Sequence, residues 1–308
     1  MADIPAWGED TSSSRKYPVC GGPGSPVMQR SFDPSRVDAN TFASRKRPGI
    51  MHWSMALCGP CDLLFAIDPR GFDQLRAAYE VDDFDAGRES IAAARTSEGI
   101  VRRMLLRPTG WPPDRLRVLD VSCGDGAFLA AMSASGASRV VGIEISEEPM
   151  RRARPDMQAI IEKCMIEDYG GTGFTLATTF QVLEHFSEPL DVLKRLHTAL
   201  DPGRFVMGVV HDRRAITNRL LGRRSPIWDV EHLQLFSKRS MTALLAAAGF
   251  RSIVLRHITN TYLAAYWLRL APAPRRMRPA MERLAQPGGR DLTIPLRVGN
   301  LAFVAQRD

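Results

Sequence analysis

The spacing of apolar and polar residues divides the 308-residue chain into four parts. Residues 1–16 are polar, contain the run TSSSRK and are expected to form a disordered lead-in. Residues 17–70 are rich in Pro, Gly and Cys but lack long periodic stretches, which predicts a small irregular module. Residues 71–114 begin with apolar residues every three or four positions and end after Trp-Pro-Pro, which predicts a helical linker or lid.

Strands and helices alternate in the fourth part, residues 115–308. Short apolar runs predict strands at 116–121, 139–145, near 158–163, 174–180, from 201 onward, 250–258 and 300–306. Amphipathic spacing predicts helices at 126–135, after Ser146, at 188–200 and at 237–249. Such alternation is typical of βαβ units in an α/β fold with a doubly wound parallel sheet. A ligand is then expected at the carboxyl ends of the strands, where the strand order reverses.

The segment RVLDVSCGDGAFLAAM, residues 117–132, joins the first of these strands to the first helix. Gly124 and Gly126 let the backbone approach a ligand where a side chain would block it. The helix N-terminus adds free N–H groups. Asp120 at the strand end can accept hydrogen bonds from an ammonium group or from those N–H groups. Glu144 ends the second strand and is well placed for the two hydroxyls of a ribose.

Two kinds of cofactor fit this pattern, and a third glycine distinguishes them. A dinucleotide site carries Gly-x-Gly-x-x-Gly to seat a pyrophosphate, whereas Leu129 stands at the third position here. A carboxylate beside the loop would also repel phosphates. S-adenosylmethionine has no phosphate and carries an amino-acid end, a sulfonium and an adenosine. The residues therefore favour S-adenosylmethionine, with a nicotinamide oxidoreductase as the disfavoured alternative.

The segment VLDVSCGDGAF resembles the first motif of class I S-adenosylmethionine-dependent methyltransferases, usually V-L-D-x-G-C-G-x-G. VVGIEIS resembles their ribose motif, and residues 164–210 resemble their later motifs in the same order. Ser122 replaces the usual first glycine, Thr175 a frequent aspartate, and Arg204 the second glycine of Pro-Gly-Gly. The resemblance covers roughly residues 115–308 and implies a doubly wound, seven-stranded Rossmann-like sheet. It implies that the cofactor is held by Asp120, Ser122, Gly124, Gly126, Glu144, Ile145, Glu167, Asp168, Phe180 and Gln181.

Histidines near the carboxyl ends of the strands are the candidate bases for methyl transfer. His185 lies in VLEHF, where methyltransferases of differing chemistry also have Glu-His, so a structural role is its alternative. Residues 225–241, SPIWDVEHLQLFSKRSM, resemble the YHEHLSYFS motif of sugar C-methyltransferases. Glu231 and His232 match its Glu-His pair, which in that family serves substrate binding and proton removal. We expect His232 with Glu231 to be the base and His185 the second candidate; ordering of the loop is the alternative for His232.

The five cysteines fit poorly with a disulfide framework and favour a reducing cytoplasm. YPVCGGP and MALCGPCDLLFA resemble the zinc-ribbon-like module that precedes some of these methyltransferases, with the pattern C-x-x-C…C-x-x-C. Cys58 and Cys61 have ligand spacing, but Pro23 stands where the partner of Cys20 would be. His52 would complete a Cys3His set for a structural zinc. The alternative is a degenerate module held by packing alone.

The composition of the chain limits the kinds of binding partner that we expect. The net charge of +7 is spread over many arginines, which suggests an acidic small acceptor or an anionic surface. No basic and aromatic recognition module is present, so nucleic acid is not expected. Neither a signal peptide nor a membrane span is expected, because the N-terminus lacks an apolar core and no run of eighteen apolar residues exists. Residues 261–273, TYLAAYWLRLAPA, have helical spacing and are expected to form core or a lid, or to touch a lipidic substrate or a second copy.

The sequence therefore predicts an S-adenosylmethionine-dependent methyltransferase that acts on a small molecule. O- or C-methylation of a sugar nucleotide or secondary metabolite is the expected reaction. Two alternatives stay open at this point: a methyltransferase of a protein or RNA that docks on the N-terminal module, and a non-catalytic methyltransferase-like fold. Neither the acceptor atom nor the oligomeric state follows from these residues.

Overall fold

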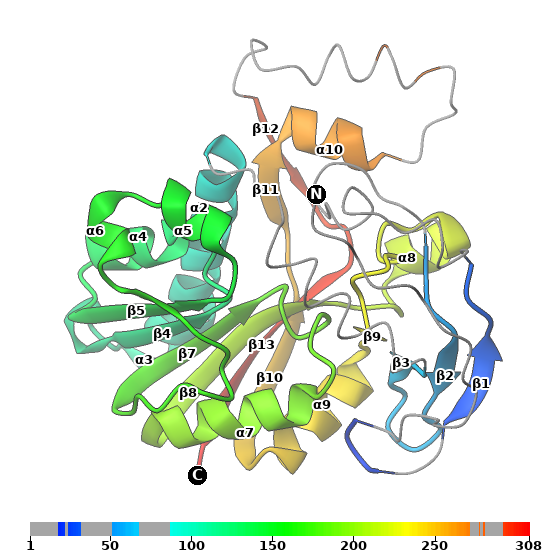
Figure 1. The fold of residues 1–308 in the computed structure, drawn as a ribbon, viewed down its shortest axis with the longest axis horizontal. Helices are drawn as coiled ribbons and strands as arrows, with labels where there is room; N and C mark the ends of the chain where they lie inside the picture. The colour runs from blue at the N-terminus through cyan, green and yellow to red at the C-terminus, as the bar shows by residue number, and fades with distance from the viewer. Residues whose placement is uncertain are drawn as a thin grey trace.

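A computed structural model describes residues 18–21, 24–31, 51–67, 87–271, 277, 280 and 292–308. The expected lead-in 1–16 and the first part of the helical linker, 71–86, lie outside the described residues. A central seven-stranded sheet dominates the described chain, and helices cover both of its faces (Figure 1).

The elements follow one another in this order: β1 (Ser25–Met28), β2 (Met55–Leu57), β3 (Leu64–Ala66), α2 (Arg88–Val101), η2 (Arg102–Leu106), α3 (Arg107–Thr109), η3 (Pro113–Arg115), β4 (Arg117–Val121), α4 (Ala127–Ala134), β5 (Arg139–Glu144), α5 (Glu147–Arg152), α6 (Pro155–Gln158), β6 (Ile161–Lys163), β7 (Phe174–Phe180), α7 (Pro189–Ala199), β8 (Leu200–His211), α8 (Ile216–Leu221), η4 (Gly222–Arg224), β9 (Gln234–Leu235), α9 (Lys238–Ala247), β10 (Phe250–His257), β11 (Asn260–Leu263), α10 (Ala264–Leu270), β12 (Thr293–Leu296) and β13 (Asn300–Arg307).

The order of the central sheet is β10-β13-β8-β7-β4-β5-β6. Strands β4 to β8 run parallel, and β13 runs antiparallel to both of its neighbours. The chain leaves β4 toward β5 on one side and later returns to place β7 on the other side. The strand order therefore reverses at β4, which is where a ligand is expected in such sheets. The seven predicted strands correspond to these seven strands, so the doubly wound fold is confirmed.

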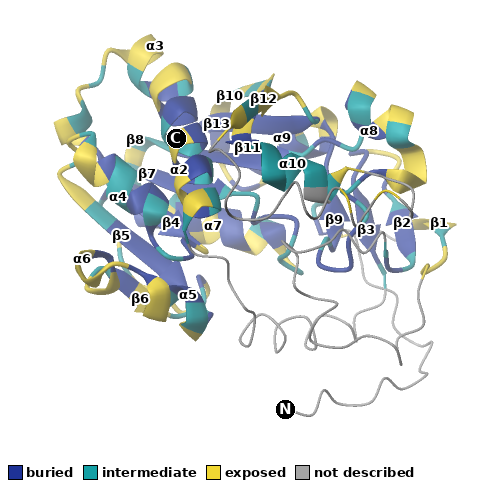
Figure 2. Cartoon of the chain, turned by 90° about the horizontal axis from the view of Figure 1, so that it is seen from above, coloured by how far each residue is buried: buried dark blue, intermediate teal, exposed yellow. Residues whose placement is uncertain are grey.

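Strand β4 shows why the sheet lies at the centre of the core. Successive side chains of a strand point to opposite faces. Val118 joins a cluster with residues of α2 and α4, whereas Leu119 joins a cluster with residues of α7 and α9. Figure 2 shows the strands buried between helices whose outer faces are exposed. A nearly continuous apolar run, as in β4, is what burial on both faces requires.

The segment 261–273 differs from the helical prediction. Asn260–Leu263 form β11, which pairs antiparallel with β12, and α10 begins only at Ala264. Tyr262 lies opposite Ile294 in this pairing. Backbone pairing with a strand some thirty residues later therefore overrides the local helical spacing, a contact that periodicity does not reveal.

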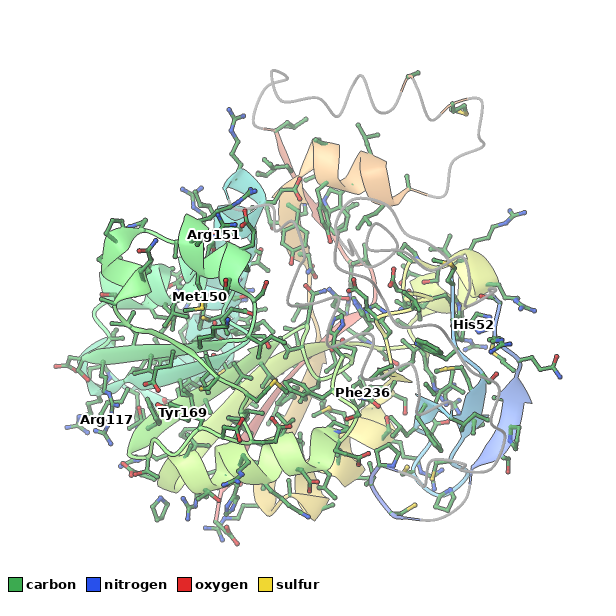
Figure 3. All side chains as sticks on the ribbon, viewed as in Figure 1. His52, Arg117, Met150, Arg151, Tyr169 and Phe236 are labelled. Carbon is green, nitrogen blue, oxygen red and sulfur yellow. The ribbon has the colours of Figure 1, made fainter. Side chains whose placement is uncertain are left out.

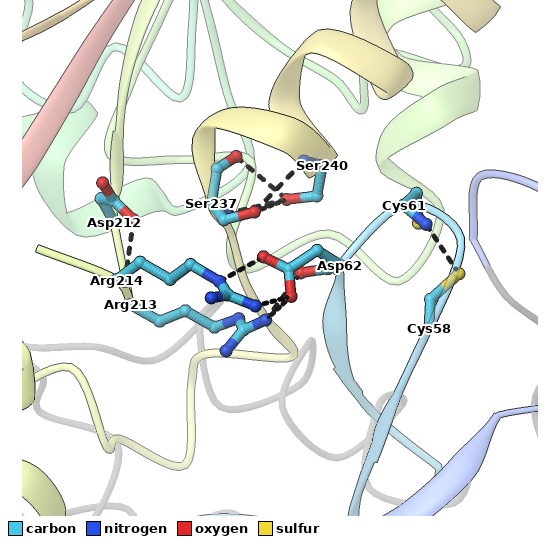
Figure 4. A network of polar contacts seen from close by, with 8 residues as sticks. All are labelled: Cys58, Cys61, Asp62, Asp212, Arg213, Arg214, Ser237 and Ser240. Atoms are coloured by element: carbon cyan, nitrogen blue, oxygen red, sulfur yellow. Dashed lines mark hydrogen bonds and ion pairs between the residues drawn. The ribbon is translucent and has the colours of Figure 1, made fainter.

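A second sheet joins the N-terminal module to the rest of the chain, and its order is β1-β2-β3-β9. Its fourth strand, β9, comes from the far side of the expected boundary near residue 115 and pairs with β3 at Leu64–Leu235 and Phe65–Gln234. Figure 4 shows a second connection: Asp62, in the turn between β2 and β3, accepts hydrogen bonds from Arg213 and Arg214, which follow β8. The module and the central sheet are thus built into one structure.

Candidate cofactor and acceptor site

The loop between β4 and α4 has an unusual backbone. Ser122, Gly124 and Gly126 all have left-handed conformations, with φ of +55°, +59° and +73°. A Cβ atom at Gly126 would also lie 3.1 Å from Met157 Cβ and 3.2 Å from Ile161 Cδ1, so a side chain there would be tightly packed as well as strained by the positive φ. At Ser122, where the related motif has glycine, a side chain is accommodated at a cost of about 1–2 kcal/mol.

The Glu144 carboxylate holds this loop in place. Its Oε2 accepts the N–H of Gly124 at 2.9 Å, and its Oε1 accepts the N–H groups of Ile145 and Ser146 at 2.9 Å each. The carboxylate is buried at the end of β5, one strand away from the loop. Glu144 therefore ties together the backbone segments that follow β4 and β5.

Asp120 lies beneath the loop rather than on the pocket wall. Its Oδ1 accepts a hydrogen bond of 2.6 Å from Thr178 Oγ1 on β7. Burial raises the pKa of Asp120 to about 7, with the Glu144 charge adding to the rise and the Thr178 hydrogen bond opposing it. A cationic group above the loop would favour the charged form of this carboxyl.

A cavity of about 900 Å³ opens at the carboxyl ends of the strands. The predicted site residues that line it are Ser122, Gly124, Glu144, Ile145, Glu167, Asp168, Phe180, Gln181, His185 and His232. Three predicted residues do not line it: Asp120, Gly126 and Glu231. The backbone N–H of Gly126 donates to the Cys123 carbonyl within the loop. Glu231 is buried beside His185. The volume lies toward the upper end of the roughly 300–1,000 Å³ typical of ligand sites.

Three histidines meet on the wall opposite the glycine loop. The His232 ring lies between His185 and His211, with centroid separations of 5.1 and 5.0 Å. His232 Nδ1 is 2.8 Å from the Ile227 carbonyl oxygen, so this nitrogen carries a proton in the neutral ring and Nε2 keeps a lone pair. Burial and the charge of His211 together lower the pKa of His232 to about 4, although Glu184 and the hydrogen bond to the Ile227 carbonyl oppose this shift.

The acids near the histidines differ from the expected pair. Glu231 Oε2 lies 3.9 Å from His185 Nδ1, so Glu231 is placed next to His185. Glu184 is not among the predicted site residues. Its side chain is fully buried, and its Oε1 accepts a hydrogen bond of 2.7 Å from the backbone N–H of His211. Its Oε2 has no hydrogen-bond partner among the described residues. The sequence signal was present, since Glu184 is the acid of VLEHF directly before His185.

Three aromatic side chains form one part of the cavity wall. Tyr262 of β11 packs against Tyr266 and Trp267 of α10, with ring centroids 4.9 and 5.4 Å apart. The Trp267 indole N–H donates to the Ile294 carbonyl of β12 at 2.8 Å, which ties the helix to the small sheet. All three aromatic residues line the cavity. Of the expected alternatives for 261–273, the position as a cover of the cavity agrees with the structure.

The expected Cys3His ligand set is not brought together. Cys20 Sγ and Cys58 Sγ are 3.8 Å apart, and the Cys61 N–H points to Cys58 Sγ. His52 precedes β2 whereas Cys58 and Cys61 follow it, so His52 lies at the other end of that strand. Figure 3 shows His52 near the N-terminal sheet. Its Nδ1 lies 2.9 Å from the Trp53 carbonyl oxygen, and its ring centroid lies 5.3 Å from that of Trp228. The described residues contain no group of three or more side chains placed to hold a metal ion.

Comparison with known proteins assigns the family. A family model described as a methyltransferase domain matches residues 93–255, more than half of the chain. The ubiquinone biosynthesis O-methyltransferase of Pseudomonas aeruginosa (strain LESB58) is 34% identical over 96 residues, which cover 28% of this chain and 40% of that protein. The enzyme of the same description from Thiobacillus denitrificans is 32% identical over 107 residues, covering 32% of this chain and 46% of that protein. The chain thus matches less than half the length of these relatives.

Solved structures of methyltransferases are also among the matches, at low sequence identity and with TM-scores below 0.5. Magnesium protoporphyrin IX methyltransferase from Synechocystis PCC 6803, solved with S-adenosylhomocysteine, is 18% identical, with a TM-score of 0.47 over 78% of this chain and 95% of that one. An S-adenosylmethionine-dependent methyltransferase from Mesorhizobium loti is 21% identical, with a TM-score of 0.44 over 68% and 99%. On the family match, the chain belongs to the class I S-adenosylmethionine-dependent methyltransferases.

Proposed function

We propose that this protein transfers a methyl group from S-adenosylmethionine to a hydroxyl group of a small, uncharged and largely apolar acceptor. The observation that carries the proposal is a single cavity that joins the Gly124 loop and Glu144 to His232. Methyl transfer needs a donor and an acceptor side by side with a base near the acceptor. At about 900 Å³ the cavity is large enough to hold a donor and a small acceptor together.

The residues present fit the cofactor. Glu144 offers a buried carboxylate for ribose hydroxyls, and Glu167 and Asp168 line the cavity beyond it, where an adenine would lie. Ser146 Oγ is buried on the cavity lining and has no hydrogen-bond partner among the described residues. A polar ligand would satisfy that hydroxyl. S-adenosylmethionine, when bound, supplies a methyl group on a positively charged sulfur.

His232 is the residue that would take the acceptor's proton. Donation of its Nδ1–H to the Ile227 carbonyl leaves the Nε2 lone pair as the accepting site. Its low pKa keeps the ring neutral at physiological pH, so no proton has to leave before an acceptor binds. His185, held beside Glu231, packs edge-on against the His232 ring and fixes its orientation. In this assignment Glu231 is a positioning residue that acts through His185.

The charge of the cavity lining supports an uncharged acceptor. No lysine or arginine is among the described lining residues, whereas three aromatic side chains form the acceptor wall. A sugar nucleotide carries a diphosphate, which proteins bind with cations or with clustered N–H groups. We therefore favour the secondary metabolite over the sugar nucleotide, and the acidic acceptor suggested by net charge finds no partner here. The relatives named as O-methyltransferases support oxygen as the acceptor atom.

Calorimetric titration with S-adenosylhomocysteine tests the part of the proposal that concerns cofactor binding. Wild-type protein should bind, and Glu144→Ala should weaken binding at least tenfold because the loop loses its anchor. Glu147→Ala is the matched control, since this exposed neighbour pairs with Lys163 on the surface. Absence of wild-type binding would contradict the proposal.

A screen of hydroxylated aromatic acceptors tests the methyl transfer itself. The mass of the methylated product is the readout. His232→Gln should bind S-adenosylhomocysteine normally but lose product formation by at least a hundredfold. Cofactor binding without turnover on any small acceptor would favour the non-catalytic fold. Turnover only on a protein or RNA would favour the macromolecular alternative.

A further inference from the structure

Helix α8 exposes two large aliphatic side chains one turn apart. Ile216 is 75% exposed and Leu220 is 82% exposed, the two highest values among the large exposed hydrophobic residues of the described chain. Positions i and i+4 lie on the same face of a helix, so the two side chains form one outward-facing patch. An apolar patch of this kind marks a contact surface rather than ordinary surface scatter.

Three arginines surround the patch. Arg219 lies between the two aliphatic residues in sequence, and Arg223 and Arg224 follow in η4. All three are exposed, and none forms an ion pair with another described residue. We use the name α8 face for Ile216, Arg219, Leu220, Arg223 and Arg224. Exposed aliphatic side chains flanked by exposed arginines are typical of surfaces that lie on anionic lipid.

The α8 face adjoins the mouth of the acceptor cavity. The inner side of the same helix, with Thr217, Asn218 and Leu221, lines the cavity. Leu296 at the end of β12 also lines it and is 39% exposed. The segment after β12 lies directly against α8, because a Cβ atom at Gly299 would come within 2.7 Å of Ala215 Cβ. Figure 2 shows α8 with its exposed outer side near α10.

We propose that the α8 face rests on an anionic lipid bilayer and that the acceptor is an amphiphile drawn from that bilayer into the aromatic end of the cavity. The second half of this statement depends on the proposed methyl transfer; the membrane contact does not. A second copy of the chain is the poorer occupant, because a symmetric contact would place three arginines against three arginines. None of the described helices is long and apolar enough to cross a membrane, so the contact is peripheral.

Flotation of the full chain with vesicles tests the contact. Wild-type protein should float with vesicles of phosphatidylcholine and one third phosphatidylglycerol at low salt, and at least tenfold less with phosphatidylcholine alone or at high salt. The double variants Ile216→Ser/Leu220→Ser and Arg223→Gln/Arg224→Gln should each reduce flotation at least tenfold. Val254→Ser and Arg102→Gln/Arg107→Gln, which change exposed residues elsewhere, are the matched controls and should float like wild type.

Three results would overturn the proposal: no flotation of wild type, equal loss in the control variants, or concentration-dependent dimers that the α8 double variants abolish. Titration of every variant with S-adenosylhomocysteine separates the two proposals. If the protein floats but does not bind S-adenosylhomocysteine, the proposed methyl transfer is wrong and the proposed membrane contact is supported. If the protein binds S-adenosylhomocysteine but does not float, the membrane contact is wrong and the cofactor site is supported.

Discussion

The indole N–H of Trp53 donates a hydrogen bond of 2.6 Å to the carbonyl of Val230, 177 residues later in the chain. Val230 directly precedes Glu231 and His232, and the residues after His232 form β9 on the edge of the N-terminal sheet. Trp53 is fully buried in a small core with Ile227, Val230 and Leu233. The N-terminal module therefore holds the segment that presents His232 to the cavity.

Replacing Trp53 by Phe should loosen that segment. The variant leaves the buried Val230 carbonyl without this donor, and we expect a loss of about 1–3 kcal/mol in the free energy of unfolding. Acceptor turnover should fall about tenfold while S-adenosylhomocysteine affinity stays within twofold. Trp111→Phe is the control, because the Trp111 indole N–H has no partner among the described residues. Wild-type stability and turnover in Trp53→Phe would refute this role.

Asp62 is the second tie between the module and the central sheet, and its removal should be costly. Its side chain is 8% exposed and pairs with Arg213, itself 17% exposed, and with Arg214. Asp62→Ala leaves a mostly buried guanidinium without its partner, which should cost about 3 kcal/mol by urea denaturation. Asp156→Ala removes an exposed pair with Arg154 and should cost under about 1 kcal/mol. Equal losses in both variants would argue against a structural role for Asp62.

The pH dependence of the Asp62 effect has a definite sign. Burial acts to raise the pKa of Asp62, but hydrogen bonds from Arg214 and Ser237 and the two arginine charges bring it below its ordinary value of 3.8. A lowered pKa means that the stabilisation is present at neutral pH and is lost as the pH falls through the folded-state value. The difference between wild type and Asp62→Ala should therefore shrink in acid.

Asp120 should show the opposite trend. Its pKa of about 7 in the folded protein means that the native state keeps a proton that the unfolded chain releases above its ordinary value of 3.8. Stability then falls as the pH rises from about 4 to about 7 and is level above that. Asp120→Asn keeps an acceptor for Thr178 but does not ionise, so its stability relative to wild type should rise by about 4 kcal/mol between pH 4 and pH 8.

Denaturation of the cofactor-free protein at several pH values measures this gap. Asp114→Asn, at an exposed position, serves as the control and should give a constant gap. A pH-independent gap for Asp120→Asn would show that Asp120 is ionised throughout the range.

The low pKa of His232 predicts an unusual rate profile. A base with an ordinary pKa of 6.5 would lose activity tenfold per pH unit below that value. Because burial and the charge of His211 lower the pKa of His232 to about 4, kcat/KM for the acceptor should stay level from pH 8 to about 5.5. His211→Gln should move the acidic limb to higher pH by removing that charge. A limb near 6.5 in wild type would contradict a base with a lowered pKa.

The meeting of the glycine loop with Glu144 was predictable because its sequence signals are local. Gly124 and Gly126 sit within one turn between a strand and a helix, and Glu144 ends the next strand. Parallel neighbours bring their carboxyl ends together, so adjacency in sequence order becomes adjacency in space. The same logic predicted the seven strands, whose apolar runs are fixed by burial on both faces of the sheet.

Long-range contacts decided the rest. Glu231 was expected to serve His232, yet packing places it beside His185, and Glu184 contacts His211. The three histidines come from separate segments, and no spacing along the chain encodes the 5 Å separations between their rings. The order of the elements, the cofactor loop and the candidate bases therefore followed from the sequence alone, because each depends on a few neighbouring residues. The pairing of β9 with the N-terminal module and the change of residues 261–263 from the predicted helix to a strand were set by tertiary structure, because backbone pairing between distant segments outweighs local preference. The same kind of pairing forms β2, which separates His52 from Cys58 and Cys61.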